Sequence, residues 1–382
     1  MSWVRSPLAA PQAKSLPGNL IPCDPPPVTA YPPERPTDDL WLTPYHPIPY
    51  LSGGHAQTML GNFWRRPPLA AQPESESVVV DAADNSRVLC HCHWQRDPLT
   101  GDLLADRLTL LLVHGLEGSS DSGYVRGITA LALRAGCSVI RMNMRNCGGT
   151  DDWTPTLYHS ARSDDAGAVL HHFQQKYTLT RIAMIGYSMG GNLVLKLAGE
   201  LAEKTPEWLI AAATVSPVTD LAESADALHE PANRAYERHF LVRLIERFRR
   251  KAQLFPEHYS LAGLPPIRSI RDFDDAIVAP HNGFTSADDY YFRASSARCV
   301  QTIRIPTLIL NALDDPFIRM RADTRETLLA NPAVRLFETP RGGHCAFLAR
   351  RQSNANFHRH WAEKTVTDFV LSADRARQTN GS

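Results

Sequence analysis

Short, continuous apolar runs alternate with longer amphipathic stretches over most of this 382-residue chain. The clearest run, Leu110–Val113, contains no polar residue, which is typical of a strand buried on both faces of a parallel sheet. The strands predicted from residue 109 onward are Thr109–Val113, Ser138–Met144, Ile182–Ile185, Ala211–Val215, Thr307–Asn311 and Val334–Phe337. This pattern predicts an α/β fold with a mostly parallel central sheet flanked by helices.

Helical periodicity occupies most of the intervals between these strands. The predicted helices are Gly123–Ala135, Arg162–Gln175, Gly190–Glu203, Ala322–Ala330 and Asn354–Leu371. Ahead of the first parallel strand, Glu76–Val80 and Arg87–Trp94 are β-rich and are separated by a polar turn. We therefore expect a β-hairpin at the start of the folded part of the chain.

Two regions break the alternation. Residues 1–50 hold 13 of the 29 prolines, which exclude regular helix and central strand and predict an extended or disordered N-terminal arm. The segment of about 219–300 contains a basic amphipathic stretch, Arg243–Lys251, which we interpret as a helix with a buried stripe rather than a membrane-surface helix. We expect one domain over residues 51–375 with a cap inserted at about 219–300, and a flexible tail at 376–382.

Charge and composition narrow the classes of protein. Lys plus Arg and Asp plus Glu each number 40, and this balance argues against a nucleic-acid partner. No apolar run approaches the roughly 18 residues that span a bilayer, and the N-terminus has no apolar core of a secretory signal. Seven cysteines without paired spacing suit a reducing compartment. We expect a soluble cytoplasmic protein whose oligomeric state the sequence leaves open.

The segment Gly186–Gly190 reads G-x-S-x-G and lies between a predicted strand and a predicted helix. This context is what a nucleophile elbow requires, because the sharp turn leaves no room for a Cβ at either glycine. It would hold the Ser188 hydroxyl above the sheet at the N-terminus of a helix, where the dipole favours developing negative charge. Ser188 is therefore the predicted nucleophile, against the alternative of an ordinary glycine-rich turn.

The segment His114–Gly118 follows another buried strand and suits a loop that donates a backbone N–H to an oxyanion. We assign the two predicted donors to the N–H groups of Leu116 and Met189. His114 itself follows the strand at once, so we interpret it as a structural histidine that supports the loop rather than as a base.

A serine nucleophile needs a histidine base and a carboxylate that orients it, and the expected chain order is Ser, acid, His. His344 lies in a glycine-containing loop after the predicted strand Val334–Phe337, and Asp314-Asp315 follows the strand Thr307–Asn311. We predict His344 as the base and Asp315 as the acid, since Asp315 precedes Pro316 and is held extended. The alternative exchanges the roles of Asp315 and Asp314.

Other clusters carry weaker signals. Cys90-His91-Cys92-His93 resembles a set of metal ligands, but successive residues of a strand point to opposite faces and no second ligand pair has a matching spacing. Glycine-rich loops that cradle phosphates, G-x-x-x-x-G-K-[ST] and G-x-G-x-x-G, do not occur in the sequence. We expect neither a metal nor an organic cofactor.

Beyond the predicted triad, several motifs resemble the YheT-like branch of the α/β-hydrolase superfamily, which includes ABHD-type lipases and phospholipases. They cover about residues 45–372 and comprise Gly54–Thr58, His114–Ser120, Tyr158–Ser160 with Asp165, Phe273–Asp275, Gly283-Phe284, Asp289–Tyr291 and Asn311–Phe317. The resemblance implies an α/β-hydrolase fold and hydrolysis of carboxylic esters, with short-chain esters or monoacylglycerol-like lipids as substrates.

Two other functions stay open at this point. An acyltransferase would use the same three residues with an alcohol or thiol in place of water, and the sequence does not separate the two outcomes. A binding module that has kept the fold is the third interpretation, and the presence of all three predicted catalytic residues argues against it.

Overall fold

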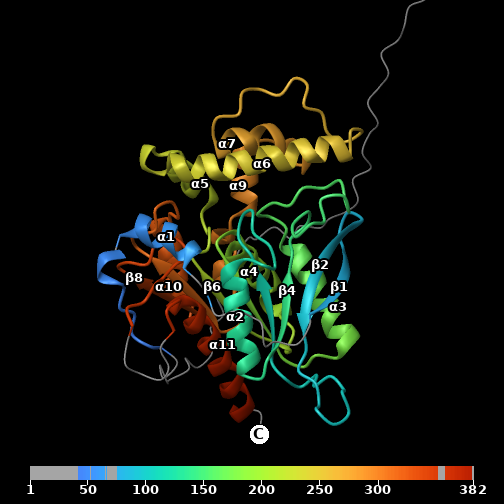
Figure 1. Ribbon diagram of the computed structural model, residues 1–382, viewed down its shortest axis with the longest axis vertical. Helices are drawn as coiled ribbons and strands as arrows, with labels where there is room; N and C mark the ends of the chain where they lie inside the picture. Colours follow the sequence, from blue (N-terminus) through green and yellow to red (C-terminus); the bar gives the residue numbers. More distant parts are fainter. Residues whose placement is uncertain (1–41, 52, 65, 67–74, 352–357, 381–382) are drawn as a thin grey trace, which may run out of the picture.

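The computed structural model describes residues 42–51, 53–64, 66, 75–351 and 358–380. Its centre is an eight-stranded sheet with the order β1-β2-β4-β3-β5-β6-β7-β8 (Figure 1). The strands are β1 Glu76–Ala82, β2 Ser86–His93, β3 Thr109–Val113, β4 Ser138–Met142, β5 Ile182–Tyr187, β6 Leu209–Val215, β7 Thr307–Ala312 and β8 Val334–Thr339. Strand β2 pairs antiparallel with both β1 and β4, and all pairs among β3 to β8 are parallel.

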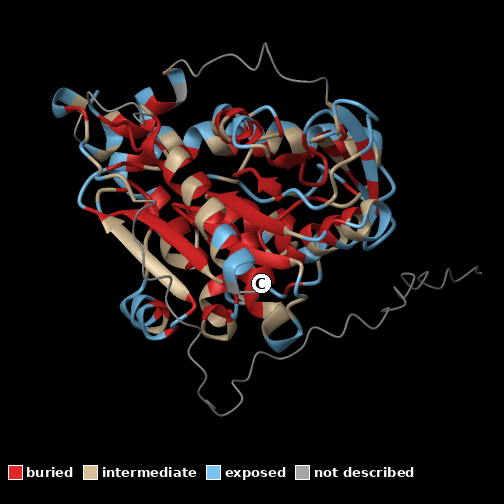
Figure 2. Cartoon of the chain, turned by 90° about the horizontal axis from the view of Figure 1, so that it is seen from below, coloured by how far each residue is buried: buried red, intermediate tan, exposed pale blue. Residues whose placement is uncertain are grey.

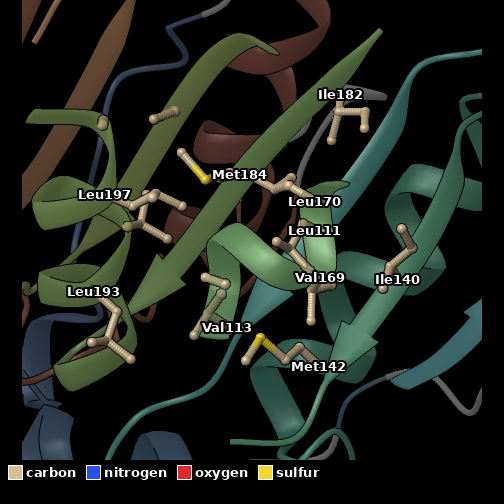
Figure 3. Packing of buried hydrophobic residues seen from close by; sticks show 14 of the residues in the cluster. Leu111, Val113, Ile140, Met142, Val169, Leu170, Ile182, Met184, Leu193 and Leu197 are labelled. Atoms are coloured by element: carbon tan, nitrogen blue, oxygen red, sulfur yellow. The ribbon is translucent and has the colours of Figure 1, made fainter. Parts of the chain in front are cut away.

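Helices cover both faces of the sheet, so the central strands are buried (Figure 2). The helices α2 (Gly123–Arg134) and α11 (Trp361–Asn380) pack on one face. The helices α3 (Ser163–Tyr177) and α4 (Met189–Leu201) pack on the other. Figure 3 shows this second layer, where Val169 and Leu193 lie among side chains of β3, β4 and β5. The prediction of a mostly parallel sheet between helices is confirmed.

Most element ends differ from the prediction by one or two residues, where sequence alone gives no sharp boundary. The predicted helix Asn354–Leu371 is the exception, since α11 spans Trp361–Asn380 and ends nine residues later than predicted. Strand β3 and α10 (Ala322–Ala330) have the predicted bounds, whereas β4 ends at Met142 rather than Met144. Residues 376–380 continue α11 instead of forming the expected tail. A hydrogen bond of 2.8 Å from Gln378 Nε2 to Asp374 Oδ2 spans one helical turn there and supports this continuation. Residues 381–382 lie outside the described part.

The connection between β6 and β7 contains a group of helices that we call the cap segment (residues 219–300). It comprises α5 Leu221–His229, α6 Arg234–Leu254, α7 Ile270–Phe273, α8 Ala279–His281, α9 Ala287–Ala294, a π-helix Asp274–Val278 and short 3-10 turns. In Figure 1, α5, α6 and α7 lie together at the top, across one end of the sheet. Their apolar faces form a buried cluster of their own, with Phe248 and Phe273 among its members.

The N-terminal region contacts the C-terminal third of the chain. Pro47 forms an isolated bridge with Ala349, and Trp361 Nε1 donates to the Thr43 carbonyl oxygen at 2.7 Å. The helix α1 (Gly54–Phe63) follows. Most of the predicted proline-rich arm, residues 1–41, lies outside the described residues. Within the described part of the chain, no helix is both long and apolar enough to cross a membrane.

Candidate active site

Ser188 occupies the turn between β5 and α4, in the strand–turn–helix arrangement that the sequence predicts. Its backbone has φ 53° and ψ −119°, a strained conformation for a residue with a side chain. A Cβ at Gly186 would come within 2.3 Å of the Gly190 carbonyl oxygen, and a Cβ at Gly190 within 2.3 Å of the His114 carbonyl oxygen. The glycines therefore make the tight turn possible, and the turn exposes the Ser188 hydroxyl at the carboxyl edge of the sheet.

His344 and Asp315 complete a chain of hydrogen bonds with Ser188. His344 Nδ1 lies 2.8 Å from Asp315 Oδ2, and His344 Nε2 lies 3.0 Å from Ser188 Oγ. An ionised carboxylate only accepts, so the imidazole donates from Nδ1, and Nε2 of the neutral ring accepts from the hydroxyl. The fold thus brings together three side chains from three separate loops in the arrangement of a nucleophile, a base and an orienting acid.

The two adjacent aspartates have different partners. Asp315 Oδ1 accepts the backbone N–H groups of Phe317 at 3.1 Å and Ile318 at 2.9 Å, which fixes the carboxylate toward the imidazole. Asp314 Oδ1 instead accepts the N–H of Gly343 at 2.9 Å and so braces the loop that carries His344. Of the two residues that the sequence left open, Asp315 is the one in contact with the histidine.

Burial and charge act on His344 in opposite directions. Burial alone would lower the pKa of His344, but the neighbouring Cys345 sulfur and the Asp315 carboxylate outweigh it, and the pKa is raised above its ordinary value. The Cys345 Sγ atom lies 3.5 Å from Nε2. The protonated form of the imidazole, which would arise if His344 took the serine proton, is therefore stabilised at this position.

Leu116 and Met189 lie beside Ser188 and line one cavity with it. The amides on either side of Leu116 are both in use, since Gly115 N–H donates to Tyr124 Oη at 2.8 Å and Glu117 N–H to Tyr158 Oη at 3.1 Å. Within the described residues, the Leu116 and Met189 N–H groups take part in no backbone hydrogen bond. These two N–H groups are available to a ligand, as an oxyanion hole requires.

His114 is fully buried and its ring is used within the fold. Its Nε2 accepts the Met144 N–H at 3.1 Å, so the proton resides on Nδ1, which donates to the Gly115 carbonyl oxygen at 2.8 Å. Burial lowers the pKa of His114 to about 4. The residue therefore supports the loop as a neutral imidazole, as the sequence suggested.

A largely apolar cavity adjoins Ser188, between the edge of the sheet and the cap segment. Its apolar lining includes Leu116, Met189, Val218, Leu228, Phe240, Leu244, Phe248, Phe273 and Phe317. Its polar lining includes His159, Ser160, Arg247, Asp274, Tyr290 and Tyr291. Burial raises the pKa of Asp274 to about 7, and Tyr291 Oη donates to this carboxyl group at 2.7 Å. The cavity therefore suits an apolar group that extends from a bond held at Ser188.

The Cys-His-Cys-His cluster does not converge on one point. Cys90 and Cys92 face the core from β2, where burial raises the pKa of both thiols. His91 Nδ1 lies on the other face, 3.1 Å from Ser77 Oγ. Among the described residues, no group of three potential ligand side chains is placed to hold a metal ion.

Sequence reasoning missed the residues that support the candidate site from a distance. Thr58 Oγ1, in α1, accepts the His344 N–H at 2.8 Å, and Gln57 Oε1 accepts the Leu348 N–H at 2.8 Å. Ser216 Oγ accepts the Cys345 N–H at 3.2 Å. The motif Gly54–Thr58 was recognised in the sequence, but nothing local in it indicates that it braces a loop nearly 300 residues later.

Comparisons with known proteins agree with this fold. A family model described as the alpha/beta hydrolase fold matches residues 109–350. The esterase Pf2001 of Pyrococcus furiosus has a similar structure, with a TM-score of 0.50 and 14% identity over 80% of this chain and 96% of that one. These matches define the class of protein, an α/β-hydrolase.

The sequences of known relatives define the branch of the family to which the chain belongs. It is 31% identical to the mouse phospholipase ABHD3 over 80% of this chain and 73% of that protein. It is 29% identical to YheT of Escherichia coli strain K12 over 85% of this chain and 92% of that protein. The chain belongs to the α/β-hydrolase family, in the branch that contains YheT and ABHD3.

Proposed function

We propose that the protein hydrolyses carboxylic esters through an acyl-enzyme on Ser188, with His344 as base and Asp315 as the acid that orients it. The observation that carries this proposal is the pair of contacts at 3.0 and 2.8 Å that join the three side chains in the order serine, histidine, aspartate. Family membership supports the same reaction class, because the relatives include a phospholipase.

In the proposed mechanism, His344 Nε2 takes the Ser188 proton as Oγ attacks the ester carbonyl carbon. The N–H groups of Leu116 and Met189 donate to the negative oxygen of the tetrahedral intermediate. His344 then gives the proton to the leaving alcohol, and the acyl group stays on Ser188. Water attacks this acyl-enzyme, with its proton taken by the same imidazole, and the carboxylic acid leaves as Ser188 Oγ regains its proton.

The cavity supports a substrate class with one apolar acyl chain, such as a short-chain ester or a monoacylglycerol-like lipid. Side chains of α5, α6 and α7 line it together with Ser188. An apolar chain would be held there by burial alone, while the ester carbonyl reaches the two free N–H groups.

The test is hydrolysis of p-nitrophenyl butyrate by the wild type and by Ser188→Ala. Loss of the serine of a triad costs on the order of 10⁶ in kcat. A fluorophosphonate probe should label the wild type at Ser188 and leave Ser188→Ala unlabelled. Hydrolysis by folded Ser188→Ala at more than a few per cent of the wild-type rate would contradict the proposal.

An acyltransferase would share the first half of this mechanism and differ only in the acceptor. Product analysis with and without ethanol separates the two outcomes. Free butyric acid as the main product at moderate ethanol concentration supports hydrolysis, and ethyl butyrate as the main product would assign the protein to acyl transfer.

A further inference from the structure

We propose that Glu117 is a positioning residue through which helix α6 of the cap segment holds the Leu116 N–H in place for the oxyanion. The inference rests on the proposed ester hydrolysis and adds a coupling between the cap and the catalytic machinery. It concerns the residue that follows Leu116 in the loop after β3, and one arginine of α6.

The carboxylate of Glu117 is held from two sides. Arg247 of α6 donates to it from Nε at 2.9 Å and from Nη2 at 3.2 Å, in a two-pronged contact. Tyr158 Oη donates to Oε1 of the same carboxylate at 2.5 Å. The Tyr158 hydroxyl also accepts the backbone N–H of Glu117 at 3.1 Å, so a single tyrosine holds both the main chain and the side chain of this residue.

The backbone of the loop needs such support. Glu117 has φ 54°, in the left-handed region that costs free energy for any residue with a Cβ. A strained conformation of this kind persists only where the surrounding structure fixes it. On the other side of Leu116, Tyr124 Oη holds the Gly115 N–H at 2.8 Å. The orientation of the free Leu116 N–H thus depends on two fixed neighbours, of which Glu117 is the one tied to the cap.

Arg247 joins the loop firmly to α6. The side chains of Glu117 and Arg247 are 7% and 16% exposed, so solvent screens their attraction only weakly. Arg247 Nη1 continues to Asp151 Oδ1 at 2.9 Å, and its guanidinium lies over the ring of Tyr158 at 5.4 Å. If α6 moves away, Glu117 loses its cation and the strained turn loses part of its support. The oxyanion site is therefore complete only when the cap lies against the sheet.

The experiment uses the variants Glu117→Gln and Arg247→Met and the double variant that carries both changes. The control is Arg243→Met, which removes an exposed arginine one turn earlier on α6. We measure kcat and KM for p-nitrophenyl butyrate, and the affinities for butyrate and for butylboronic acid. Butylboronic acid forms a tetrahedral adduct with an active serine. In Glu117→Gln, kcat and boronic-acid affinity should each fall by about 10-fold to 100-fold, less than or equal to the loss of a whole oxyanion donor. KM and the affinity for butyrate should stay near the wild-type values, because these report the ground state.

The double variant should lose no more kcat and boronic-acid affinity than the more impaired single variant, because both changes remove the same contact between Glu117 and Arg247. The control Arg243→Met should match the wild type. Unchanged kcat and boronic-acid affinity in folded Glu117→Gln would overturn the inference. So would a loss of kcat accompanied by an equal rise in both KM and the butyrate dissociation constant, which marks general damage to the cavity.

Hydrogen exchange gives a readout that does not depend on activity. In Arg247→Met, the amide of Glu117 should exchange faster than in the wild type, while amides of β3 keep their rates. Unchanged exchange at Glu117 would overturn the coupling. If the wild type hydrolyses no ester and Ser188 is not labelled, the proposed function fails by itself, and the exchange experiment still decides whether α6 holds the loop.

Discussion

At the scale of the residue, the adjacent aspartates show how the fold assigns separate tasks to identical side chains. Asp315 contacts His344 Nδ1, while Asp314 accepts the Gly343 N–H and shapes the loop that carries the histidine. A residue that precedes a proline is restricted to extended backbone conformations, so an extended Asp315 before Pro316 can be predicted from the sequence. The hydrogen bond to Gly343 joins residues on two different loops, so the role of Asp314 could not be predicted.

Substitution of these aspartates separates the two roles. Asp315→Asn should lower kcat by roughly 10⁴, because an amide favours the wrong histidine tautomer. Asp314→Asn should lower it much less, since an amide oxygen can still accept the Gly343 N–H. Both variants are measured as folded proteins at neutral pH. A larger loss in Asp314→Asn would transfer the role of the acid to Asp314.

The pH dependence of the reaction follows from the raised pKa of His344. The base must be neutral to accept the Ser188 proton, so kcat/KM falls as the pH drops through this pKa. Because Asp315 and Cys345 raise the pKa above 6.5, the midpoint of the acid limb should lie above pH 6.5. In Cys345→Ala the midpoint should shift downward. A wild-type midpoint below 6.5 would contradict the raised pKa of His344.

At the scale of the element, the sheet and the cap segment differ in how readily sequence reveals them. Strands such as β3 are short apolar runs, because a strand buried on both faces needs apolar side chains at every position. The cap segment combines one long helix, α6, with short helices, and their buried faces pack mainly on one another. Four or eight residues, as in α7 and α9, are too few for a clear helical period. The location of the cap segment and the Arg243–Lys251 part of α6 were therefore predicted, whereas its short helices were not.

The aromatic residues of the cap segment fall into distinct groups. Phe273, Tyr290 and Tyr291 line the cavity beside Ser188. Phe284 packs against His159 and Tyr290 instead, in a second layer. Phe292 is 59% exposed. Sequence alone could not sort these residues, because the sorting depends on how the short helices face one another.

Truncation of a cavity residue should change the preferred acyl length. Phe240 of α6 lines the cavity and is only partly buried, so Phe240→Ala enlarges the space with a moderate loss of stability. The variant should favour longer p-nitrophenyl esters than the wild type does. The control Phe292→Ala removes an exposed ring of the same size. If both variants keep the wild-type profile, the cavity does not hold the acyl chain.

At the scale of the whole molecule, parts of the chain that lie far apart in sequence meet around Glu363. Arg66 Nε donates to Glu363 Oε1 of α11 at 2.6 Å, and a Cβ at Gly127 of α2 would come within 1.9 Å of Glu363 Oε2. Three segments thus meet around one buried carboxyl group. No local pattern in the sequence indicates this meeting, just as none indicates the contact between Thr58 and His344.

This carboxyl group should make the stability of the fold depend on pH. Burial raises the pKa of Glu363 from its ordinary value of 4.5 to about 7, although the charge of Arg66 lowers it. The folded protein therefore binds this proton more tightly than the unfolded chain does. Its contribution to stability is complete below pH 4.5 and is lost as the pH rises through 7. The difference in pKa corresponds to about 3 kcal/mol between these limits.

The prediction is tested by urea unfolding of the wild type and Glu363→Gln at pH 4.5, 6 and 8. The glutamine carries no titrating proton, so the free energy of unfolding of the wild type should decline relative to that of the variant as the pH rises. Glu326→Gln, at an exposed position of α10, is the matched control and should follow the wild type. Parallel curves for the wild type and Glu363→Gln would contradict a pKa of Glu363 that lies between the tested pH values in the folded protein.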